Sequence, residues 1–277
     1  MPATFVVVPE WQGSISARAM RLIDGAEAIR GDLPSSATRL VDVPVGAGES
    51  LDTGVRRYSS VLHIKQNLLA ELSGVDGTAL TIGGDCAVSL GAIEHSLAAH
   101  PDAAVLWFDA HPDLNTPESS PSGAFNGMVL RTLMGEGAEG LVPPAGQRVS
   151  SERLVLAGIR DVDPAEAEVI AERSIPCLDV DRLGDADALL EALAATGASE
   201  VYVHVDLDVL DPAVIEGLDY PLPFGLTVEA LTSLIAAVRA RFTLVGATIA
   251  GFSPATPEAA ADDLPSILRL ISALTRG

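Results

Sequence analysis

The sequence has little of several features that would define a functional class. Its only cysteines are Cys86 and Cys177, so it lacks the disulfide framework of a small extracellular domain. No apolar run approaches the roughly 20 residues that a membrane-spanning helix requires. The opening stretch MPATFVVVPE holds a short apolar run without the basic residues of a secretory signal. We therefore expect a cytoplasmic protein whose first apolar run is a strand.

Basic residues are also scarce. The chain has 17 Lys and Arg against 38 Asp and Glu, which gives a net charge of −21. Nucleic acids and anionic membrane surfaces select basic patches, so we expect neither as a partner. Apolar residues make up 48% of the chain, which predicts a folded globular protein. An acidic chain of this kind also has carboxylates available for metal cations.

What the sequence does contain is a regular alternation of two patterns. Short apolar runs without polar alternation predict strands that are buried on both faces. These runs are 4–8, 38–43, 78–82, 103–108, 153–159, 201–205 and 243–249, with a shorter one in 174–179. Amphipathic segments of helical length separate them: 14–30, 54–73, 87–100, 126–135, 164–173, 185–196, 227–240 and 257–275. With no linker or repeat, this predicts one domain, 1–277: a three-layer αβα fold with a doubly wound, mostly parallel sheet of about eight strands.

Acidic residues and a histidine follow two of these strands. In doubly wound sheets ligands bind outside the carboxyl ends of the strands. Asp109, His111 and Asp113 alternate after the run that ends at 108, and Asp206 and Asp208 alternate after the run that ends at 205. Alternate residues of an extended segment face the same side. Each motif alone is typical of solvated or helix-capping acids, but together they predict a binuclear site. Its oxygen-rich donors favour Mn²⁺, and two such ions share one hydroxide that acts as a nucleophile.

Four motifs, taken in order, give the chain a resemblance to the ureohydrolase family of arginase, agmatinase and formiminoglutamase. They are GGD at 83–85, DAHPDLN at 109–115, RDVDP at 160–164 and DLDVLDP at 206–212. The resemblance implies a hydrolase with two Mn²⁺ ions per subunit that cleaves a guanidino or related C–N bond. It also allows a homo-oligomer, although the chain ends soon after its last predicted helix, where arginases often have a longer tail.

The resemblance also implies roles for the metal ligands. Asp109 and Asp206 would bridge the two ions. Asp113 would complete one metal and, as a catalytic residue, accept a hydrogen bond from the bridging hydroxide. His111 and Asp208 would complete the other metal.

Three positions depart from the family pattern. Cys86 stands where the family has a histidine metal ligand, Asn126 stands where it has a proton-shuttling histidine, and Gly251 stands where it has the glutamate that holds the guanidinium. Thiolate is soft and Mn²⁺ prefers hard ligands, so Cys86 is either a ligand or a near neighbour of the metal. The changes fit either altered chemistry or a decayed, inactive site that still binds metal.

The residues that the family uses for an amino-acid substrate are all present. By motif match, Asn115 and Ser122 would hold the α-carboxylate, and Asp163 and Glu166 would hold the α-amino group. Singly, each has a local explanation, such as capping of a helix by Asp163. As a set of four they favour an arginine-like α-amino acid as the substrate.

An intact amino-acid end and an altered guanidine end together predict the substrate Nω-hydroxy-L-arginine, hydrolysed to hydroxyurea and L-ornithine. N-hydroxyguanidine is a weaker base than guanidine and so depends less on an ionic glutamate. The alternatives are another ureohydrolase (an arginase, a formiminoglutamase or a guanidino-acid hydrolase) and a metal-binding module without activity. Glu216, Asp219 or Tyr220 could replace the lost contacts. His204, on the strand face of Asp206, is expected either to support the metals and their catalysis or simply to pack.

Overall fold

A computed structural model describes residues 3–276 and contains one parallel sheet of eight strands, which confirms the predicted fold class. Every predicted strand is present. Strands buried on both faces tolerate uninterrupted apolar runs, which is why the sequence located them. The strands are β1 Thr4–Val7, β2 Thr38–Leu40, β3 Ala79–Ile82, β4 Ala104–Phe108, β5 Leu154–Ala157, β6 Cys177–Leu178, β7 Glu200–Asp206 and β8 Thr243–Ala250. Of these, β1, β3 and β4 are one residue shorter than expected, β2, β5 and β6 are three or four residues shorter, and β7 and β8 are slightly longer.

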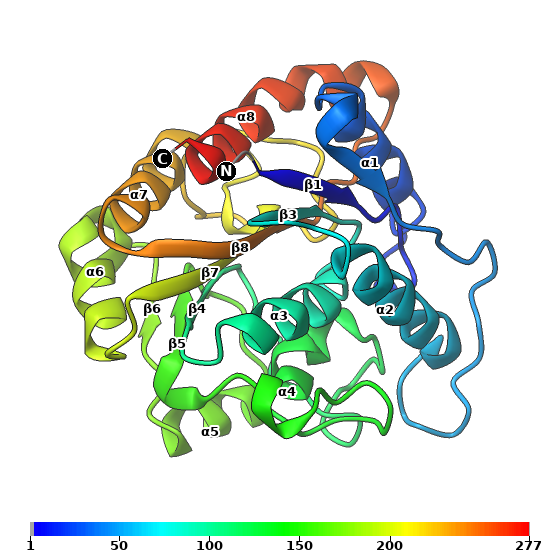
Figure 1. The fold of residues 1–277 in the computed structure, drawn as a ribbon, viewed down its shortest axis with the longest axis horizontal. Coiled ribbons are helices and arrows are strands. Elements are labelled where there is room, and N and C mark those ends of the chain that lie inside the picture. Colours follow the sequence, from blue (N-terminus) through cyan, green and yellow to red (C-terminus); the bar gives the residue numbers. More distant parts are fainter. Residues whose placement is uncertain (1–2, 277) are drawn as a thin grey trace.

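Helices cover both faces of the sheet and form two separate apolar cores with it (Figure 1). One face carries α1, α6, α7 and α8, and the other carries α2, α3, α4 and α5. Neighbouring residues of a strand enter opposite cores, as Trp107 and Phe108 of β4 do. The helices are α1 Arg21–Gly31, α2 Tyr58–Leu72, α3 Val88–Ala99, α4 Val129–Leu133, α5 Pro164–Glu172, α6 Ala186–Ala195, α7 Val228–Arg241 and α8 Pro257–Thr275.

The strand order β2-β1-β3-β8-β7-β4-β5-β6 brings chemically important strand ends side by side. In the register of the sheet, Val205 of β7 pairs with Phe108 of β4 on one side and with Ile249 of β8 on the other. Ile249 also pairs with Ile82 of β3. The segments that follow these four strands therefore begin at the same level of one sheet edge.

Two predicted helices differ most from the structure, while the predicted helix 54–73 begins four residues late, at Tyr58. The segment 14–30 is helical only from Arg21, because Ser14 and Ser16 donate their hydroxyl protons to the buried carboxylate of Asp219 and hold residues 14–20 in turns. The segment 126–135 forms one turn of 3-10 helix, η2 Asn126–Met128, followed by the short α4. Both segments border the candidate site described below.

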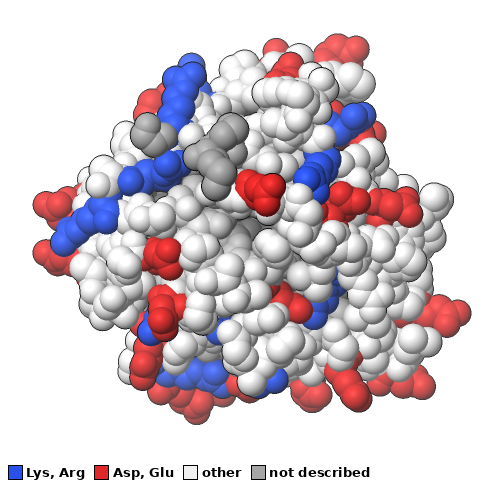
Figure 2. Space-filling view, in the orientation of Figure 1, with Lys and Arg blue, Asp and Glu red and all other residues white. Residues whose placement is uncertain are grey.

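The surface keeps the acidic character of the sequence. Figure 2 shows acidic side chains around the edge of the viewed face, with basic side chains in smaller groups between them. Within residues 3–276, none of the helices has the length and apolar character needed to cross a membrane.

Candidate metal centre

Buried acids gather where β4 and β7 end. Asp109 follows β4 directly, Asp206 ends β7, and Asp208 lies in the single 3-10 turn that follows. Asp113 adopts a left-handed backbone conformation, with φ of 52°, four residues after Asp109. All four side chains are at least 92% buried, which is unusual for carboxylates that lack cationic partners.

One half of the centre joins an imidazole to two of these carboxylates. Nδ1 of His111 lies 3.0 Å from Oδ2 of Asp208 and 3.5 Å from Oδ1 of Asp109. The three ligand atoms lie within 4.8 Å of one another, a spacing that suits one cation between them. The structure therefore brings together the donors that the sequence predicted for this half.

In the other half, the thiol of Cys86 lies beside one carboxylate oxygen of Asp109 and one of Asp206. Cys86 Sγ lies 2.9 Å from Asp206 Oδ2 and 3.7 Å from Asp109 Oδ2. Asp113 Oδ2 is buried and has no hydrogen-bond partner among the described residues. Asp109 thus has one oxygen directed to each half of the centre, as a bridging ligand requires. Cys86 reaches the ligand positions and is not an isolated core residue.

The electrostatics of the cluster favour bound cations. Burial, followed by repulsion from neighbouring carboxylates, raises the pKa of Asp113 and Asp206 well above the usual range and that of Asp208 to about 6. Burial and the charge of Asp206 also raise the pKa of the Cys86 thiol. Although burial opposes it, the charge of Asp208 raises the pKa of His111. Divalent cations would relieve this repulsion, so the donor set fits a binuclear metal site.

A cavity of about 200 Å³ opens beside the centre, and the predicted amino-acid contacts line its far end. Asn115 Nδ2 donates to Asp163 Oδ2 at 2.9 Å. Glu166 accepts the backbone N–H of Leu114 at 2.8 Å and that of Asp163 at 2.9 Å. Burial raises the pKa of Glu166 to about 7. Ser122 lines the same end, so the four predicted side chains do converge.

In the part of the chain that the structure describes, the end of the cavity beside the acidic cluster has no carboxylate apart from those of the cluster itself. Asn126, Tyr220 and Ile15 line it. Asp219 is occupied by the hydroxyl groups of Ser14 and Ser16 and does not line the cavity, and Glu216 is exposed. Of the three residues considered as replacements, only Tyr220 reaches the cavity. Ile15 was missed, since its segment reads as a helix in the sequence.

Gly251 occupies a position that excludes a side chain. Its φ is 86°, and a Cβ atom there would lie 2.3 Å from Oδ1 of Asp206. Its backbone is held on both sides: the N–H donates to Gly84 O at 2.7 Å, and the carbonyl accepts Asp219 N–H at 3.1 Å. The glycine is therefore built into the wall of the metal centre.

His204 lies beneath the centre and not in the cavity. It is completely buried on β7, and its Nε2 lies 3.7 Å from Cys86 Sγ. The sequence placed it on the right strand face but could not give this distance.

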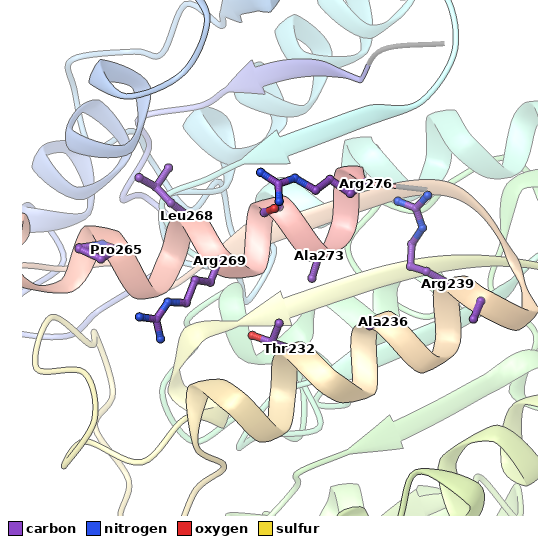
Figure 3. A pocket seen from close by; sticks show the side chains of 10 residues that line it. Thr232, Ala236, Arg239, Pro265, Leu268, Arg269, Ala273 and Arg276 are labelled. Atoms are coloured by element: carbon purple, nitrogen blue, oxygen red, sulfur yellow. The ribbon is translucent and has the colours of Figure 1, made fainter.

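A larger cavity, about 790 Å³, lies elsewhere, in the groove between α7 and α8 (Figure 3). Arginines and small side chains line it, with no carboxylate, imidazole or thiol. Arg239 donates to the carbonyl of Leu274, and Arg269 pairs with Glu229 at 3.3 Å. These contacts hold the two helices together, and the groove lacks the donors of the metal centre.

Comparison with known proteins agrees with this geometry. Residues 19–264 match the model of the arginase family. The arginase of Staphylococcus aureus (strain MRSA252) is 32% identical over 207 residues, which cover 72% of this chain and 67% of that protein. The arginase of Bacillus caldovelox is 31% identical over 78% of this chain and 75% of its own length. The structure of Entamoeba histolytica arginase in complex with L-ornithine superimposes with a TM-score of 0.85 at 23% identity, covering 99% of this chain and 98% of that one, a likeness of fold.

Proposed function

This chain belongs to the arginase family, so it is a hydrolase acting on amidino C–N bonds, and we propose that its substrate is Nω-hydroxy-L-arginine. One observation carries the proposal: Asn115, Ser122, Asp163 and Glu166 line one cavity with the acidic cluster, and apart from the acids of that cluster no described carboxylate lines the cavity beside Asn126 and Tyr220. The reaction adds water across the C–N bond to the ornithine side chain. It yields L-ornithine and hydroxyurea.

The proposed cofactor is a pair of Mn²⁺ ions. Asp109 and Asp206 would bridge them, Cys86 and Asp113 would complete one site, and His111 and Asp208 the other. When bound, such a pair lowers the pKa of a shared water and supplies a hydroxide at neutral pH. The unpartnered Oδ2 of Asp113 is available to accept a hydrogen bond from that nucleophile. The carboxylate-rich donor set supports Mn²⁺, and the thiol is its one soft member.

At the other end of the cavity, charge complementarity supports an α-amino acid. Asp163 and Glu166 would hold the α-ammonium group, and Asn115 and Ser122 would hold the α-carboxylate through neutral donors. Fixing this end would hold the C–N bond beside the proposed metal site, because the two sets of residues line one small cavity.

The guanidine end supports the hydroxylated substrate over arginine. A buried guanidinium needs an anionic partner, whereas the less basic N-hydroxyguanidine can enter as a neutral group. Neither Gly251 nor Asn126 carries a charge, and Asp219 is already engaged. The Asn126 amide can orient a substrate nitrogen or oxygen but cannot shuttle a proton. This combination resembles the Nω-hydroxy-L-arginine hydrolase of D-cycloserine biosynthesis, which would place the reaction in antibiotic production.

L-arginine is the second candidate, because the relatives that share about a third of their residues with this chain are named arginases. The test is a side-by-side measurement of kcat/KM for Nω-hydroxy-L-arginine and L-arginine with added Mn²⁺. We expect the hydroxylated substrate to be favoured by about 100-fold or more, the size of effect that a missing ionic contact produces. A preference for arginine would overturn the proposal. Turnover of neither substrate by the metal-loaded protein would favour the inactive metal-binding module.

The matched variant for this assay is Asp163→Asn, with Glu168→Gln as the control. Asp163 lies in the cavity, whereas Glu168 is exposed on α5 and does not line it. The first change should raise KM for the amino acid and leave metal content unchanged, while the second should alter KM little. Equal effects of both variants would argue against an amino-acid end at Asp163.

A further inference from the structure

His204 has polar contacts at both ends of its buried ring. The ring stacks on Trp107, with 3.5 Å between ring centroids and 15° between planes. Its Nδ1 lies 2.8 Å from Ser89 Oγ on α3. Its Nε2 lies 3.7 Å from Cys86 Sγ and 3.7 Å from Asp109 Oδ2. A side chain held in this way can act on the ligands above it without touching the substrate.

The Ser89 hydroxyl decides which ring nitrogen carries the proton. Among residues 3–276, Nδ1 of His204 is the only hydrogen-bond partner of that hydroxyl. Buried hydroxyl donors are almost always satisfied, so the Ser89 O–H donates to Nδ1. The ring proton then lies on Nε2, directed toward the metal centre.

The sulfur of Cys86 is the better acceptor for this N–H. Asp109 Oδ2 already accepts Trp107 Nε1–H at 3.1 Å, and 3.7 Å exceeds the range of an N–H···O bond. The larger sulfur atom accepts at longer distances, so 3.7 Å remains within reach. The other polar neighbours of the sulfur are the carboxylates of Asp109 and Asp206. In the described chain, His204 is therefore the neighbour that can donate to a thiolate at this position.

We propose that His204 is a positioning residue that donates its Nε2–H to the Cys86 thiolate when that sulfur binds a metal. The inference rests on the proposed binuclear centre. A thiolate here is repelled by the carboxylates of Asp109 and Asp206, and one N–H directed at it offsets part of that repulsion. The relay from Ser89 through His204 to Cys86 also fixes the direction of the sulfur. Metal ligands generally require such outer partners, whose loss weakens metal binding about 10- to 100-fold.

The test uses the full-length protein loaded with Co²⁺, because a cobalt–thiolate bond has its own charge-transfer absorption. We expect His204→Asn and Ser89→Ala to shift that absorption and to weaken one of the two metal sites about 10- to 100-fold in a metal titration. The other site should keep its affinity. His63→Asn on the exposed surface of α2 is the matched control and should change neither quantity. Ser89→Ala is the milder change should His204→Asn fail to fold.

A double-mutant cycle with Cys86→Ala separates this role from general packing. If His204 acts through the sulfur, His204→Asn should weaken metal binding no further in the Cys86→Ala background. Equal losses in both backgrounds would overturn the proposal, since the effect would then pass through Asp109 or the fold. X-ray absorption showing one nitrogen ligand fewer in His204→Asn would also overturn it, by making His204 a direct ligand. No substrate is used, so a wrong substrate assignment leaves the test intact.

Discussion

At the residue scale, the structure gives a physical context to each of the three positions that the sequence resemblance marks as departures from the arginase pattern. Cys86 puts a sulfur beside the carboxylates, and Asn126 puts an amide in the cavity. Gly251 has no side chain at the position that faces Asp206. Gly251 is the most constrained, since its φ is 86° and Asp206 fills the space in front of it. Replacing this glycine alone cannot restore an arginase-like carboxylate.

Gly251→Glu should therefore damage the site and not convert it to arginine hydrolysis. A side chain at this φ is strained, by about 1–3 kcal/mol, and its Cβ would lie 2.3 Å from Asp206 Oδ1. We expect a lower free energy of unfolding in urea and less bound metal by elemental analysis. Gly184→Ala is the control: its Cβ would meet no atom within 4 Å, so stability should change by under about 0.5 kcal/mol. Two bound metals together with new arginine turnover would contradict this expectation.

Single residues also show which parts of the site could be predicted from the sequence. The alternation of Asp109, His111 and Asp113 after an apolar run pointed to the cluster, but the segment is not extended there: it bends after β4, and Asp113 has a left-handed φ of 52°. The role of His204 stayed open, because its function depends on Ser89 and Cys86, which approach from other elements. Local sequence patterns do not show which elements pack against one another or at what distance.

At the scale of elements, the segments that follow the strands form the end of the sheet that carries the candidate site. Arg160, in the segment after β5, links three of these loops through backbone carbonyls. Its guanidinium donates to the carbonyls of Gly158 at 3.1 Å, Asp208 at 2.6 Å, Leu222 at 2.8 Å and Pro223 at 3.1 Å. The loop that carries Tyr220 and the turn that carries Asp208 thus share one anchor.

Arg160→Lys should loosen this anchor while keeping its charge. A lysine has three donors on one atom and cannot reproduce the planar fork, so several carbonyls lose their partners. We expect the free energy of unfolding to fall by about 2–3 kcal/mol and metal affinity to fall through Asp208. The measurement is urea unfolding with an unchanged m-value. Arg153→Lys, whose partner Asp102 is exposed, should change stability by under about 1 kcal/mol. Equal effects in both variants would disprove the anchoring role.

The sequence predicted the strands well, but it did not predict the conformation of residues 14–20 or the order of the strands. Strand positions were predictable because burial on both faces requires apolar runs, as in Ala104–Phe108. The segment 14–20 was mistaken for helix because its partner, Asp219, lies about 200 residues away in the chain. The strand order was likewise hidden, so the sequence could place donors at strand ends without showing which ends are neighbours.

At the scale of the whole molecule, negative charge is concentrated inside as well as outside. The net charge is −21, and several carboxylates are buried around one small cavity. Without cations, folding must either keep these groups protonated or leave them repelling one another. The stability of the metal-free fold should therefore depend on pH in the opposite sense to that of a protein held by ordinary salt bridges.

The pKa shifts give the direction of that dependence. The folded-state pKa of Asp208 is about 6, and those of Asp113 and Asp206 are also raised. From about pH 4 to about pH 6, and at higher pH for the more strongly raised groups, the folded state therefore holds protons that the unfolded chain has released. Stability then falls as pH rises. The raised pKa of His111 acts in the same sense: its contribution is complete below its unfolded pKa, about 6.5, and is lost at higher pH. Among the groups of the centre, Asp109 and His204 have lowered pKa values and act in the opposite sense: they add stability with rising pH, and their gains are complete near pH 5 and a little above the unfolded histidine pKa of about 6.5, respectively.

We therefore expect the Tm of the metal-free protein in EDTA to decrease between about pH 5.5 and about pH 7.5, and saturating Mn²⁺ to remove most of that decrease. The cations take the place of the protons, so the gap between loaded and metal-free protein should widen with pH; at 100 times Kd, one bound ion adds about 2.7 kcal/mol. Calorimetric scans of both forms measure this. Asp206→Asn combined with Asp208→Asn is the control, since neutral amides should flatten the metal-free profile and abolish the Mn²⁺ effect. A metal-free Tm that rises across this range would show that the buried carboxylates are not the source of the pH dependence.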